Sequence, residues 1–498
     1  MRLRHLLDLG VRLEGADDDD PEIVSLTADS REVRPGSVFA ALVGSRVDGR
    51  NFIEKAIEKG AAAILADPSI SGRALGVPLI IDPEPRRRLA LMAATFTSAQ
   101  PEHVVAVTGT SGKTSVASLV RQIWLRLGKS AAALGTLGLQ SPVLTIDGGL
   151  TTPDPVRLHG LLGELAAKGV DHLAIEASSH GLDQHRLDGI RFEAAAFTNL
   201  SHDHLDYHAT LEDYLQAKAR LFKELLPENG TAVLNADTPE FAHLNAICGA
   251  RGLDVIDYGR VARRLTLLEQ KDGLDGQRLR IAWRGREHAL SVGLIGNFQG
   301  ANLLAAVGLV LANGRFEIDA VLATASEVQG VPGRLELIGH HRKGAPVFVD
   351  YAHKPDALEK VLTTVRPYVD GRLVVVFGCG GDRDREKRPL MGKIAVERAD
   401  RVFITDDNPR SEDPATIRRQ ILDAAPGAVD VADRAEAIHL AVSMLDVGDV
   451  LVVAGKGHET GQIVGDVVLP FDDAAVVAAA LTEERGDDHG SSEDGIKR

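Results

Sequence analysis

A short glycine-rich segment in the middle of the chain constrains the fold more than any other feature. Thr108-Gly109-Thr110-Ser111-Gly112-Lys113-Thr114 follows an apolar run at 103–107 and opens an amphipathic stretch at 114–127, which Gly128 ends. A buried strand, a glycine turn and a helix in this order are typical of parallel α/β sheets that bind phosphate. The pattern therefore predicts an α/β fold with a phosphate site at this turn.

The residue types in the segment suit phosphate chemistry. Glycines let backbone N–H groups approach phosphate oxygens, Lys113 can neutralise the β- and γ-phosphates, and the Thr114 hydroxyl can reach Mg²⁺. The segment departs from the general phosphate-loop pattern at Val107, where the first spaced glycine would stand. The alternative is a glycine-rich turn with a solvated lysine, but the flanking strand and helix favour phosphate binding.

Length and charge narrow the class of protein. A chain of 498 residues with 44% hydrophobic and 26% charged residues predicts about three domains of ordinary globular composition. The net charge of −15 argues against a binder of duplex nucleic acid. Charged residues at 2, 4, 8, 12 and 14 interrupt any signal-peptide core, and no apolar run could span a membrane. With two cysteines, we expect a cytoplasmic protein without membrane insertion.

The chain divides into three blocks and a tail. Residues 1–100 alternate short apolar runs with helical stretches and predict a small N-terminal α/β domain. Residues 101–332 predict a central doubly wound domain around the phosphate-binding glycine loop, and 333–482 a C-terminal Rossmann-like α/β domain. Residues 483–498 are polar and lack periodicity, so we expect a disordered tail.

A second polar constellation follows predicted strands of the central block. Glu176 opens Glu176-Ala-Ser-Ser-His180, and several histidines, including His204, lie between 199 and 208. Carboxylate and imidazole are acceptable ligands of a divalent cation, although a polar loop with exposed or capping histidines explains the spacing equally well. Lys218, judged from its surroundings alone, looks like an exposed helical lysine.

In the third block, apolar runs at 347–349, 402–404 and 451–453 each stop at polar residues. Ligands of open α/β sheets bind beyond the carboxyl ends of strands, so these polar residues are candidates for one site. Arg383 and Arg410 could pair with carboxylates, while Asp407 and Glu459 could accept from ammonium groups, as an amino acid requires. The alternative is a set of ion pairs within the domain.

These motifs, in this order, resemble the Mur ligase family over nearly the whole chain. The resemblance rests on 108–114, 176–180, 199–208, Tyr214-x-x-Ala217-Lys218, Asp350-Tyr-Ala-His353 and Asp407-Asn408-Pro409-Arg410. The last tetrad is similar to the signature of members that use meso-2,6-diaminopimelate, whose second carboxylate a guanidinium can bind. Ser111 stands where the family commonly has asparagine, and Lys354 where it frequently has threonine.

The resemblance implies an ATP-dependent ligase of peptidoglycan precursor synthesis. It would add meso-2,6-diaminopimelate to UDP-N-acetylmuramoyl-L-alanyl-D-glutamate through an acyl phosphate, releasing ADP and phosphate, and act as a monomer with no nucleic-acid partner. A lysine-adding enzyme or a folylpolyglutamate synthase is the nearest alternative. A nucleotide-dependent switch or binding module could also use the loop, but it would leave the third-block clusters without a ligand.

The resemblance also assigns roles to residues. ATP contacts would be Gly109, Thr110, Ser111, Gly112, Lys113, Thr114, Ser115, Asn302, Arg334, Asp350 and His353. Contacts to the UDP-muramoyl-peptide would be Ser30, Thr151, Thr152, Ser178, Gln184 and Arg186. Diaminopimelate contacts would be Arg383, Asp407, Asn408, Pro409, Arg410, Gly455 and Glu459. Mg²⁺ would be held by Thr114, Glu176, His204 and a carbamylated Lys218, and the catalytic residues would be Lys113, Lys218 and His204.

Overall fold

The computed structural model describes residues 1–7, 11–15, 20–44, 47–201, 203, 207–273 and 276–486, of which 485 and 486 by backbone alone. The chain divides into two compact units. The first comprises Met1–Leu268, Ile281–His288 and Ala301–Ala325; the second comprises Glu269–Arg280, Ala289–Gly300 and the chain from Ser326 onward. Across the described ranges, no helix is both long and apolar enough to cross a membrane.

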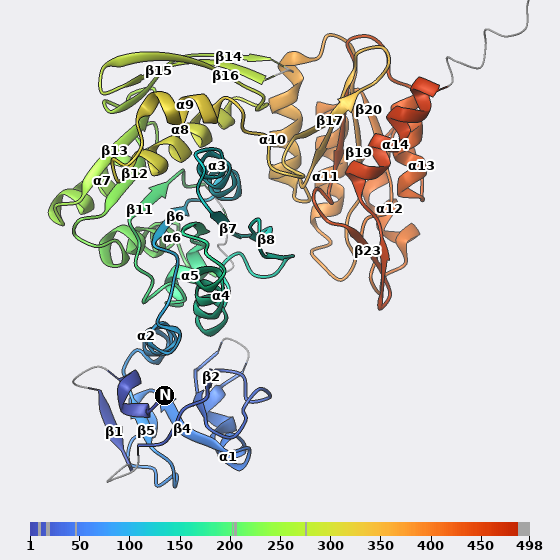
Figure 1. The fold of residues 1–498 in the computed structure, drawn as a ribbon. Coiled ribbons are helices and arrows are strands. Elements are labelled where there is room, and N and C mark those ends of the chain that lie inside the picture. Colours follow the sequence, from blue (N-terminus) through green and yellow to red (C-terminus); the bar gives the residue numbers. More distant parts are fainter. Residues whose placement is uncertain are drawn as a thin grey trace, which may run out of the picture. The chain divides into compact units, whose positions relative to one another are not determined.

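The N-terminal residues of the first unit form a small α/β domain around a five-stranded sheet (Figure 1). Its order is β1-β5-β4-β3-β2, with β1 antiparallel to β5 and the other pairs parallel. The elements are β1 (Arg12–Glu14), β2 (Ser25–Thr27), β3 (Ser37–Ala40), α1 (Ile53–Glu58), β4 (Ala61–Ala66), β5 (Leu79–Ile81) and α2 (Pro85–Thr97). Strand β3 is fully buried, as expected for a parallel strand covered on both faces.

The larger sheet has, within the described residues, the order β16-β15-β14-β13-β12-β11-β6-β10-β7-β8-β9. Its strands are β6 (His103–Thr108), β7 (Ala131–Gly135), β8 (Gly138–Gln140), β9 (Thr145–Ile146), β10 (His172–Glu176), β11 (Ala194–Phe197), β12 (Thr231–Asn235), β13 (Asp254–Gly259), β14 (Leu265–Gly273), β15 (Gly276–Trp283) and β16 (Arg286–Val292). The strands from β7 to β13 in this order are parallel. The chain passes from β10 on one side of β6 to β11 on the other, so the crevice for a ligand is expected beyond the carboxyl end of β6.

Helices cover both faces of this sheet. They are α3 (Lys113–Arg126), α4 (Pro155–Ala167), α5 (Ser179–Asp183), α6 (Leu211–Arg220), α7 (Phe241–Ala250), α8 (Phe298–Leu311) and α9 (Ile318–Ala325). Figure 1 shows β6 and β11 between α8 and α9 on one side and α5 and α6 on the other. The predicted doubly wound central domain is therefore confirmed.

The second unit contains a six-stranded sheet in the order β17-β18-β22-β19-β20-β21, parallel except for β17. Its strands are β17 (Glu336–His340), β18 (Pro346–Asp350), β19 (Leu373–Phe377), β20 (Arg401–Ile404), β21 (Val429–Asp430) and β22 (Val450–Ala454), and a separate hairpin joins β23 (Gly461–Val464) to β24 (Val467–Pro470). Its helices are α10 (Pro355–Val365), α11 (Lys387–Arg398), α12 (Pro414–Leu422), α13 (Arg434–Ser443) and α14 (Asp473–Gly486).

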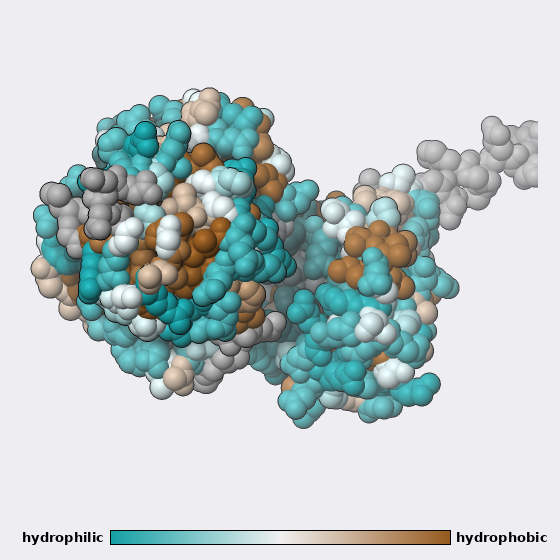
Figure 2. Space-filling model, turned by 90° about the horizontal axis from the view of Figure 1, so that it is seen from below, coloured by the Kyte–Doolittle hydropathy of each residue, from teal (hydrophilic) through white to brown (hydrophobic). Residues whose placement is uncertain are grey.

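Successive side chains of β19 point to opposite faces of the sheet and belong to two different hydrophobic cores of this unit. Val375 and Phe377 pack with residues of α10, α11 and α12, while Val374 and Val376 pack with residues of α13 and α14. The sheet is thus covered on both faces, which confirms the predicted Rossmann-like C-terminal domain. Figure 2 shows mostly hydrophilic residues on the face that it draws, with separate hydrophobic patches.

The prediction that a disordered tail begins at residue 483 is wrong for its first residues. Helix α14 continues to Gly486 because its last turns are held by ion pairs. Glu483 lies 3.0 Å from His439, and Glu484 lies 3.5 Å from Arg342. The rest of the predicted tail, 487–498, lies outside the described residues.

Candidate functional site

The glycine loop forms the turn between β6 and α3, as predicted. Gly112 stands before α3 in a left-handed conformation (φ 91°), and in the described structure no side chain caps the helix. The first N–H groups of the helix are therefore available to an anion. A Cβ on Gly109 would lie 1.9 Å from the Thr198 hydroxyl, and one on Gly112 would lie 2.4 Å from Asn302 Oδ1. Both glycines are thus required by close packing as well as by backbone conformation.

Two lysines meet at the carbonyl of Gly109. Lys113 Nζ donates to the carbonyls of Gly109 and Thr110, each at 2.8 Å, and Lys218 Nζ donates to the Gly109 carbonyl at 2.9 Å. Lys218 is 1% exposed and lies 4.1 Å from the centre of the Tyr214 ring. The interpretation of Lys218 as an exposed helical lysine is wrong, because α6 turns this residue into the protein beside the loop.

Burial, together with the positive charge of Lys113, holds the pKa of Lys218 well below its usual range, against the opposing effect of Asp203. Burial also raises the pKa of Tyr214 to about 12. Immediately after Lys218 and Arg220 the helix widens into a π-helical segment, Leu221–Leu225, an irregularity frequent at functional sites. A buried amine with a lowered pKa is a nucleophile at neutral pH.

Glu176 ends β10 and is 2% exposed. Its carboxylate accepts from the Thr114 hydroxyl at 3.0 Å and from the N–H and hydroxyl of Thr136 at 2.8 and 3.2 Å. A Cβ on Gly135 would lie 2.0 Å from Glu176 Oε1, so the backbone of Gly135 lies against the carboxylate. The carboxylate and the Thr114 hydroxyl form an oxygen-rich pair of the kind that Mg²⁺ prefers.

The remaining predicted metal ligand, His204, lies outside the described residues. Among those that are described, no group of three or more His, Cys, Asp or Glu residues could hold a metal ion. Within the described residues, Glu176 and the Thr114 hydroxyl are therefore the oxygen donors that lie together for such a cation.

Two residues that follow β11 hold the loop; the sequence analysis placed Asn199 in the second polar constellation but did not predict this role. Asn199 accepts from the N–H groups of Thr110 and Ser111 at 2.8 and 3.0 Å, through its carbonyl and side chain respectively. The Thr198 hydroxyl donates to the Ser111 carbonyl at 2.7 Å. The segment that follows the neighbouring strand thus fixes the loop. Two other predicted ATP contacts are buried: Ser115 in α3 and Asn302 in α8.

Most of the predicted muramoyl-peptide contacts come together near the end of β10. The Thr152 hydroxyl lies 2.9 Å from that of Ser178, and the Thr152 carbonyl accepts from Arg186 at 2.7 Å. Arg186 also donates to Gln184 at 2.7 Å. The Thr151 hydroxyl lies 3.0 Å from that of Thr136, which itself donates to Glu176. This network links the predicted muramoyl-peptide contacts to the Glu176 carboxylate beside the phosphate loop.

Ser30 follows β2 in the N-terminal domain, where its carbonyl accepts from Lys59 at 2.8 Å. The preceding residue, Asp29, forms an ion pair with Arg31. None of the hydrogen bonds described for Ser30 reaches the other predicted contacts.

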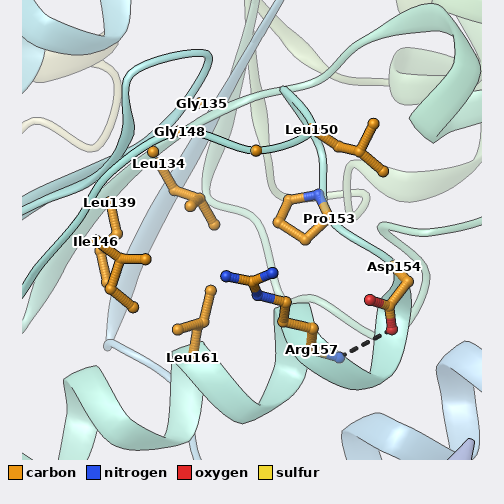
Figure 3. Close-up of a pocket in the computed structure, with 12 residues that line it drawn as sticks. Leu134, Gly135, Leu139, Ile146, Gly148, Leu150, Pro153, Asp154, Arg157 and Leu161 are labelled. Atoms are coloured by element: carbon orange, nitrogen blue, oxygen red, sulfur yellow. Dashed lines mark hydrogen bonds between the residues drawn. The ribbon is translucent and has the colours of Figure 1, made fainter. Parts of the chain in front are cut away.

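A pocket that the sequence did not predict lies beside the Thr151–Thr152 segment. Leu134, Leu139, Ile146 and Leu161 contribute to its wall. Figure 3 shows the guanidinium of Arg157 pointing into it from the first turn of α4, while the backbone N–H of Arg157 donates to the capping residue Asp154. A guanidinium in such a setting can bind a carboxylate or phosphate.

In the second unit, Asp350 ends β18 and accepts from the N–H groups of Leu335 and Ala352 at 2.6 and 2.8 Å. Burial raises its pKa to about 6, although Arg334 and these two donors oppose the shift. The Arg334 guanidinium stacks 4.8 Å from the centre of the Tyr351 ring. His353 Nδ1 lies 2.8 Å from the Tyr351 carbonyl, and burial lowers the pKa of this imidazole. The three predicted nucleotide contacts of this unit therefore cluster at one strand end.

The predicted amino-acid contacts gather where β19, β20 and β22 end. Asn408 donates to Glu459 at 2.9 Å, and Arg410 donates to the Gly381 carbonyl at 2.8 Å. A Cβ on Gly381 would lie 1.9 Å from the Pro409 carbonyl, so the two loops are in close contact. Asp407 is buried, Arg410 is half-buried, and Arg383 is exposed. The loops that carry the acidic side chains and the Arg410 guanidinium thus meet at these strand ends.

Gly455 has φ 116°, a conformation that favours glycine, and a Cβ there would lie 3.9 Å from Asp407 Oδ2. The buried Lys456 contacts Asp407 and Glu459, so the alternative of ion pairs within the domain is also realised. The sequence prediction missed Lys456, although a lysine between two glycines at the end of a buried strand was a visible signal.

Comparisons with known proteins identify the family of the chain. Three family models match the chain: "Mur ligase family, catalytic domain" at 22–97, "Mur ligase middle domain" at 107–310, and "Mur ligase, glutamate ligase domain" at 333–457. A protein of Bradyrhizobium diazoefficiens, named UDP-N-acetylmuramoyl-L-alanyl-D-glutamate--2,6-diaminopimelate ligase, is 52% identical over 487 residues, which cover 97% of this chain and 99% of the relative. The chain belongs to the Mur ligase family.

Further relatives agree. A protein of the same name from Mesorhizobium japonicum is 50% identical over 483 residues, covering 97% of this Mur ligase and 99% of the relative. A solved structure of a UDP-N-acetylmuramoyl-L-alanyl-D-glutamate--2,6-diaminopimelate ligase superposes with a TM-score of 0.70 at 33% identity, covering 93% of this chain and 95% of that one. The three-domain α/β architecture is therefore that of a Mur ligase.

Proposed function

We propose that this Mur ligase joins meso-2,6-diaminopimelate to UDP-N-acetylmuramoyl-L-alanyl-D-glutamate, at the expense of ATP, in peptidoglycan precursor synthesis. The observation that carries the proposal is the convergence at β6, β10 and β11. Thr114 connects the phosphate loop to Glu176, and the Gly109 carbonyl connects Lys113 to Lys218. The two curated relatives bear the name of this ligase over nearly their whole length, which supports the choice of substrates.

The reaction must activate a carboxylate, because an oxide is a poor leaving group and its charge repels an amine. Phosphorylation of the D-glutamate γ-carboxylate by ATP gives an acyl phosphate and ADP. Attack by a deprotonated amine of diaminopimelate then forms the amide and expels phosphate. The uncapped N-terminus of α3 binds phosphate oxygens, and Lys113, once released from the carbonyls it now contacts, neutralises the transferring group.

Mg²⁺ would bind at Glu176 and the Thr114 hydroxyl, whose oxygens fit its preference. When bound, it would supply charge neutralisation to the phosphates. We propose that Lys218 reacts there as a neutral amine with carbon dioxide, forming an N–C bond and losing one proton. The product is an anionic carbamate with oxygen donors, and the lowered pKa of Lys218 favours the amine form that this step needs. His204 stays a predicted ligand and catalytic residue.

The amino acid would bind at the strand ends of the second unit. Arg383 and Arg410 would pair with the carboxylate at the end of diaminopimelate that does not react, while Asp407 and Glu459 accept from its ammonium group. Asn408, Pro409 and Gly455 complete the set. Lysine lacks that second carboxylate and would leave the guanidinium groups unpaired, so the site discriminates against it.

The other predicted contacts are proposed with the same function. Gly109 to Ser115, together with Asn302, Arg334, Asp350 and His353, would bind ATP, and Ser30, Thr151, Thr152, Ser178, Gln184 and Arg186 would bind the UDP-muramoyl-peptide. We propose domains at 1–100, 101–332 and 333–482, and a cytoplasmic monomer. The nucleotide nature of both co-substrates is consistent with that compartment.

Release of ADP tests the proposal. Purified protein is supplied with ATP, Mg²⁺ and UDP-N-acetylmuramoyl-L-alanyl-D-glutamate, and diaminopimelate is added last. We expect ADP release to depend on diaminopimelate and the nucleotide product to gain the mass of one diaminopimelate residue. ADP release that is independent of any amino acid, with no new amide, would instead support a nucleotide hydrolase.

A further inference from the structure

Lys456 is one of the most deeply buried charged residues of the second unit. It follows β22 between Gly455 and Gly457, and its side chain is 0% exposed. Taking an ammonium group out of water costs several kcal/mol unless close partners compensate it. Such a residue needs an explanation, because a leucine or methionine would fill the same space at lower cost.

The partners of Lys456 are all predicted amino-acid contacts. Its Nζ lies 3.1 Å from Asn408 Oδ1, 3.4 Å from Glu459 Oε2 and 3.5 Å from Asp407 Oδ1. These three side chains come from two segments that follow different strands, β20 and β22. The ammonium group is therefore the common point that joins the two segments.

The contact with Lys456 also fixes which way the Asn408 amide faces. Asn408 Oδ1 accepts both from Lys456 and from the Ile463 N–H at 2.9 Å. The amide nitrogen is then left to donate to Glu459 Oε2 at 2.9 Å. Within the described residues, Glu459 Oε1 takes part in no hydrogen bond, and the Glu459 side chain is 36% exposed. The second oxygen of this carboxylate is thus free for an external ammonium group.

Charge gives a second reason for a cation at this position. Asp407 and Glu459 both contact Lys456, and like charges in a buried cluster repel. Within the described residues, the nearby Arg434 donates to Asp473 through two contacts of 2.7 Å and to the Ala454 carbonyl at 2.9 Å, whereas Lys456 is in direct contact with both carboxylates. Lys456 therefore holds both carboxylates in place before any ligand arrives.

We propose that Lys456 is a positioning residue for the amino-acid substrate: it contacts no substrate itself but holds Asp407, Asn408 and Glu459 ready to accept the substrate's ammonium group. This inference rests on the proposed function, since it assumes that the cluster binds diaminopimelate. Hydrogen-bond acceptors that are already in place reduce the cost of binding, so Lys456 should affect the affinity for diaminopimelate and not that for ATP or the UDP-dipeptide.

Steady-state kinetics of Lys456→Met test the proposal, with Arg372→Met as the matched control. Arg372 forms a 2.6 Å ion pair with Asp449 at the opposite end of β19 and β22, away from the candidate site. For Lys456→Met we expect the KM for diaminopimelate to rise tenfold or more. The KM values for ATP and the UDP-dipeptide, and kcat at saturating diaminopimelate, stay within about threefold. Arg372→Met should lower stability but leave all three KM values unchanged.

A double-mutant cycle with Glu459→Gln separates positioning from general damage. If Lys456 acts through Glu459, the double variant should lose less affinity for diaminopimelate than the product of the two single losses. Equal rises in all three KM values, an unchanged KM for diaminopimelate, or strictly multiplicative losses would overturn the proposal.

Lys456→Gln covers the possibility that methionine prevents folding, because its amide still donates but carries no charge. Failure of both variants to fold would assign Lys456 to stability and overturn the proposal equally. Absence of diaminopimelate-dependent ADP release in the unmodified protein would contradict the proposed function instead.

Discussion

Replacing Gly112 by alanine tests the geometry of the phosphate loop most sharply. Gly112 has φ 91° and ends the loop directly before Lys113. An added Cβ would lie 2.4 Å from Asn302 Oδ1, closer than real Cβ atoms approach other atoms. Because Asn302 is buried in α8, either its side chain or the loop must move.

Gly128, at the other end of α3, is a matched control. It has φ 76°, and a Cβ there would meet nothing within 4 Å. Gly128→Ala should therefore destabilise the folded state by about 1–2 kcal/mol, the cost of placing an alanine in the left-handed conformation. Gly112→Ala carries the same cost and the collision with Asn302 in addition. A loop displaced by about 1 Å at the phosphates costs roughly a hundredfold in rate.

Chemical denaturation and ATP-dependent kinetics compare the two variants. We expect both to lose stability, and Gly112→Ala alone to lose about a hundredfold in kcat/KM for ATP. Combining Gly112→Ala with Asn302→Gly removes the collision, so the double variant should regain packing in the loop. It should not regain the contact that Asn302 is proposed to make with ATP. Equal kcat/KM for ATP in the two single variants would refute the assignment of this loop as the phosphate site.

Three further outcomes are expected. Lys218→Ala should abolish ligase activity, and a short carboxylic acid in excess should restore part of it by supplying the missing oxygen donors; full activity of the variant would contradict the role of Lys218. The folded-state pKa of Asp350, about 6, exceeds its ordinary value of 3.8, so the folded protein binds the Asp350 proton more tightly than the unfolded chain does. The stability that this proton contributes is complete below pH 3.8 and is lost as the pH rises through 6. Denaturation between pH 4 and 7 should therefore show the stability of the unmodified protein falling relative to Asp350→Asn, by at most about 3 kcal/mol; a difference independent of pH would contradict it. Asp473→Asn leaves the fully buried Arg434 without its carboxylate and should destabilise the protein by about 3–5 kcal/mol, whereas Arg434→Met with Asp473→Leu should recover most of that loss in the same assay.

The phosphate loop was predictable because its signals are local. The apolar run, the glycines and the helix all lie within about 25 consecutive residues, and the observed β6 and α3 agree with the predicted bounds to within one residue. The strand-end clusters of the second unit were predictable for the same reason, since each polar cluster directly follows its strand.

Contacts between distant segments could not be predicted in this way. Thr136 holds Glu176 from 40 positions away, and Lys218 reaches the Gly109 carbonyl from 109 positions away. Nothing in the local pattern of α6 distinguishes a buried lysine from an exposed one. The family resemblance supplied that distinction, and the packing of α6 against the loop explains it.

Competition between two amino acids in one reaction tests the central claim most directly. The protein is given ATP, Mg²⁺, UDP-N-acetylmuramoyl-L-alanyl-D-glutamate and equal concentrations of meso-diaminopimelate and L-lysine, and the nucleotide products are separated by mass. We predict that the diaminopimelate product predominates by at least a hundredfold, because only this amino acid offers a second carboxylate, at the end that does not react, to Arg383 and Arg410. Comparable amounts of both products, or an excess of the lysine product, would contradict the account.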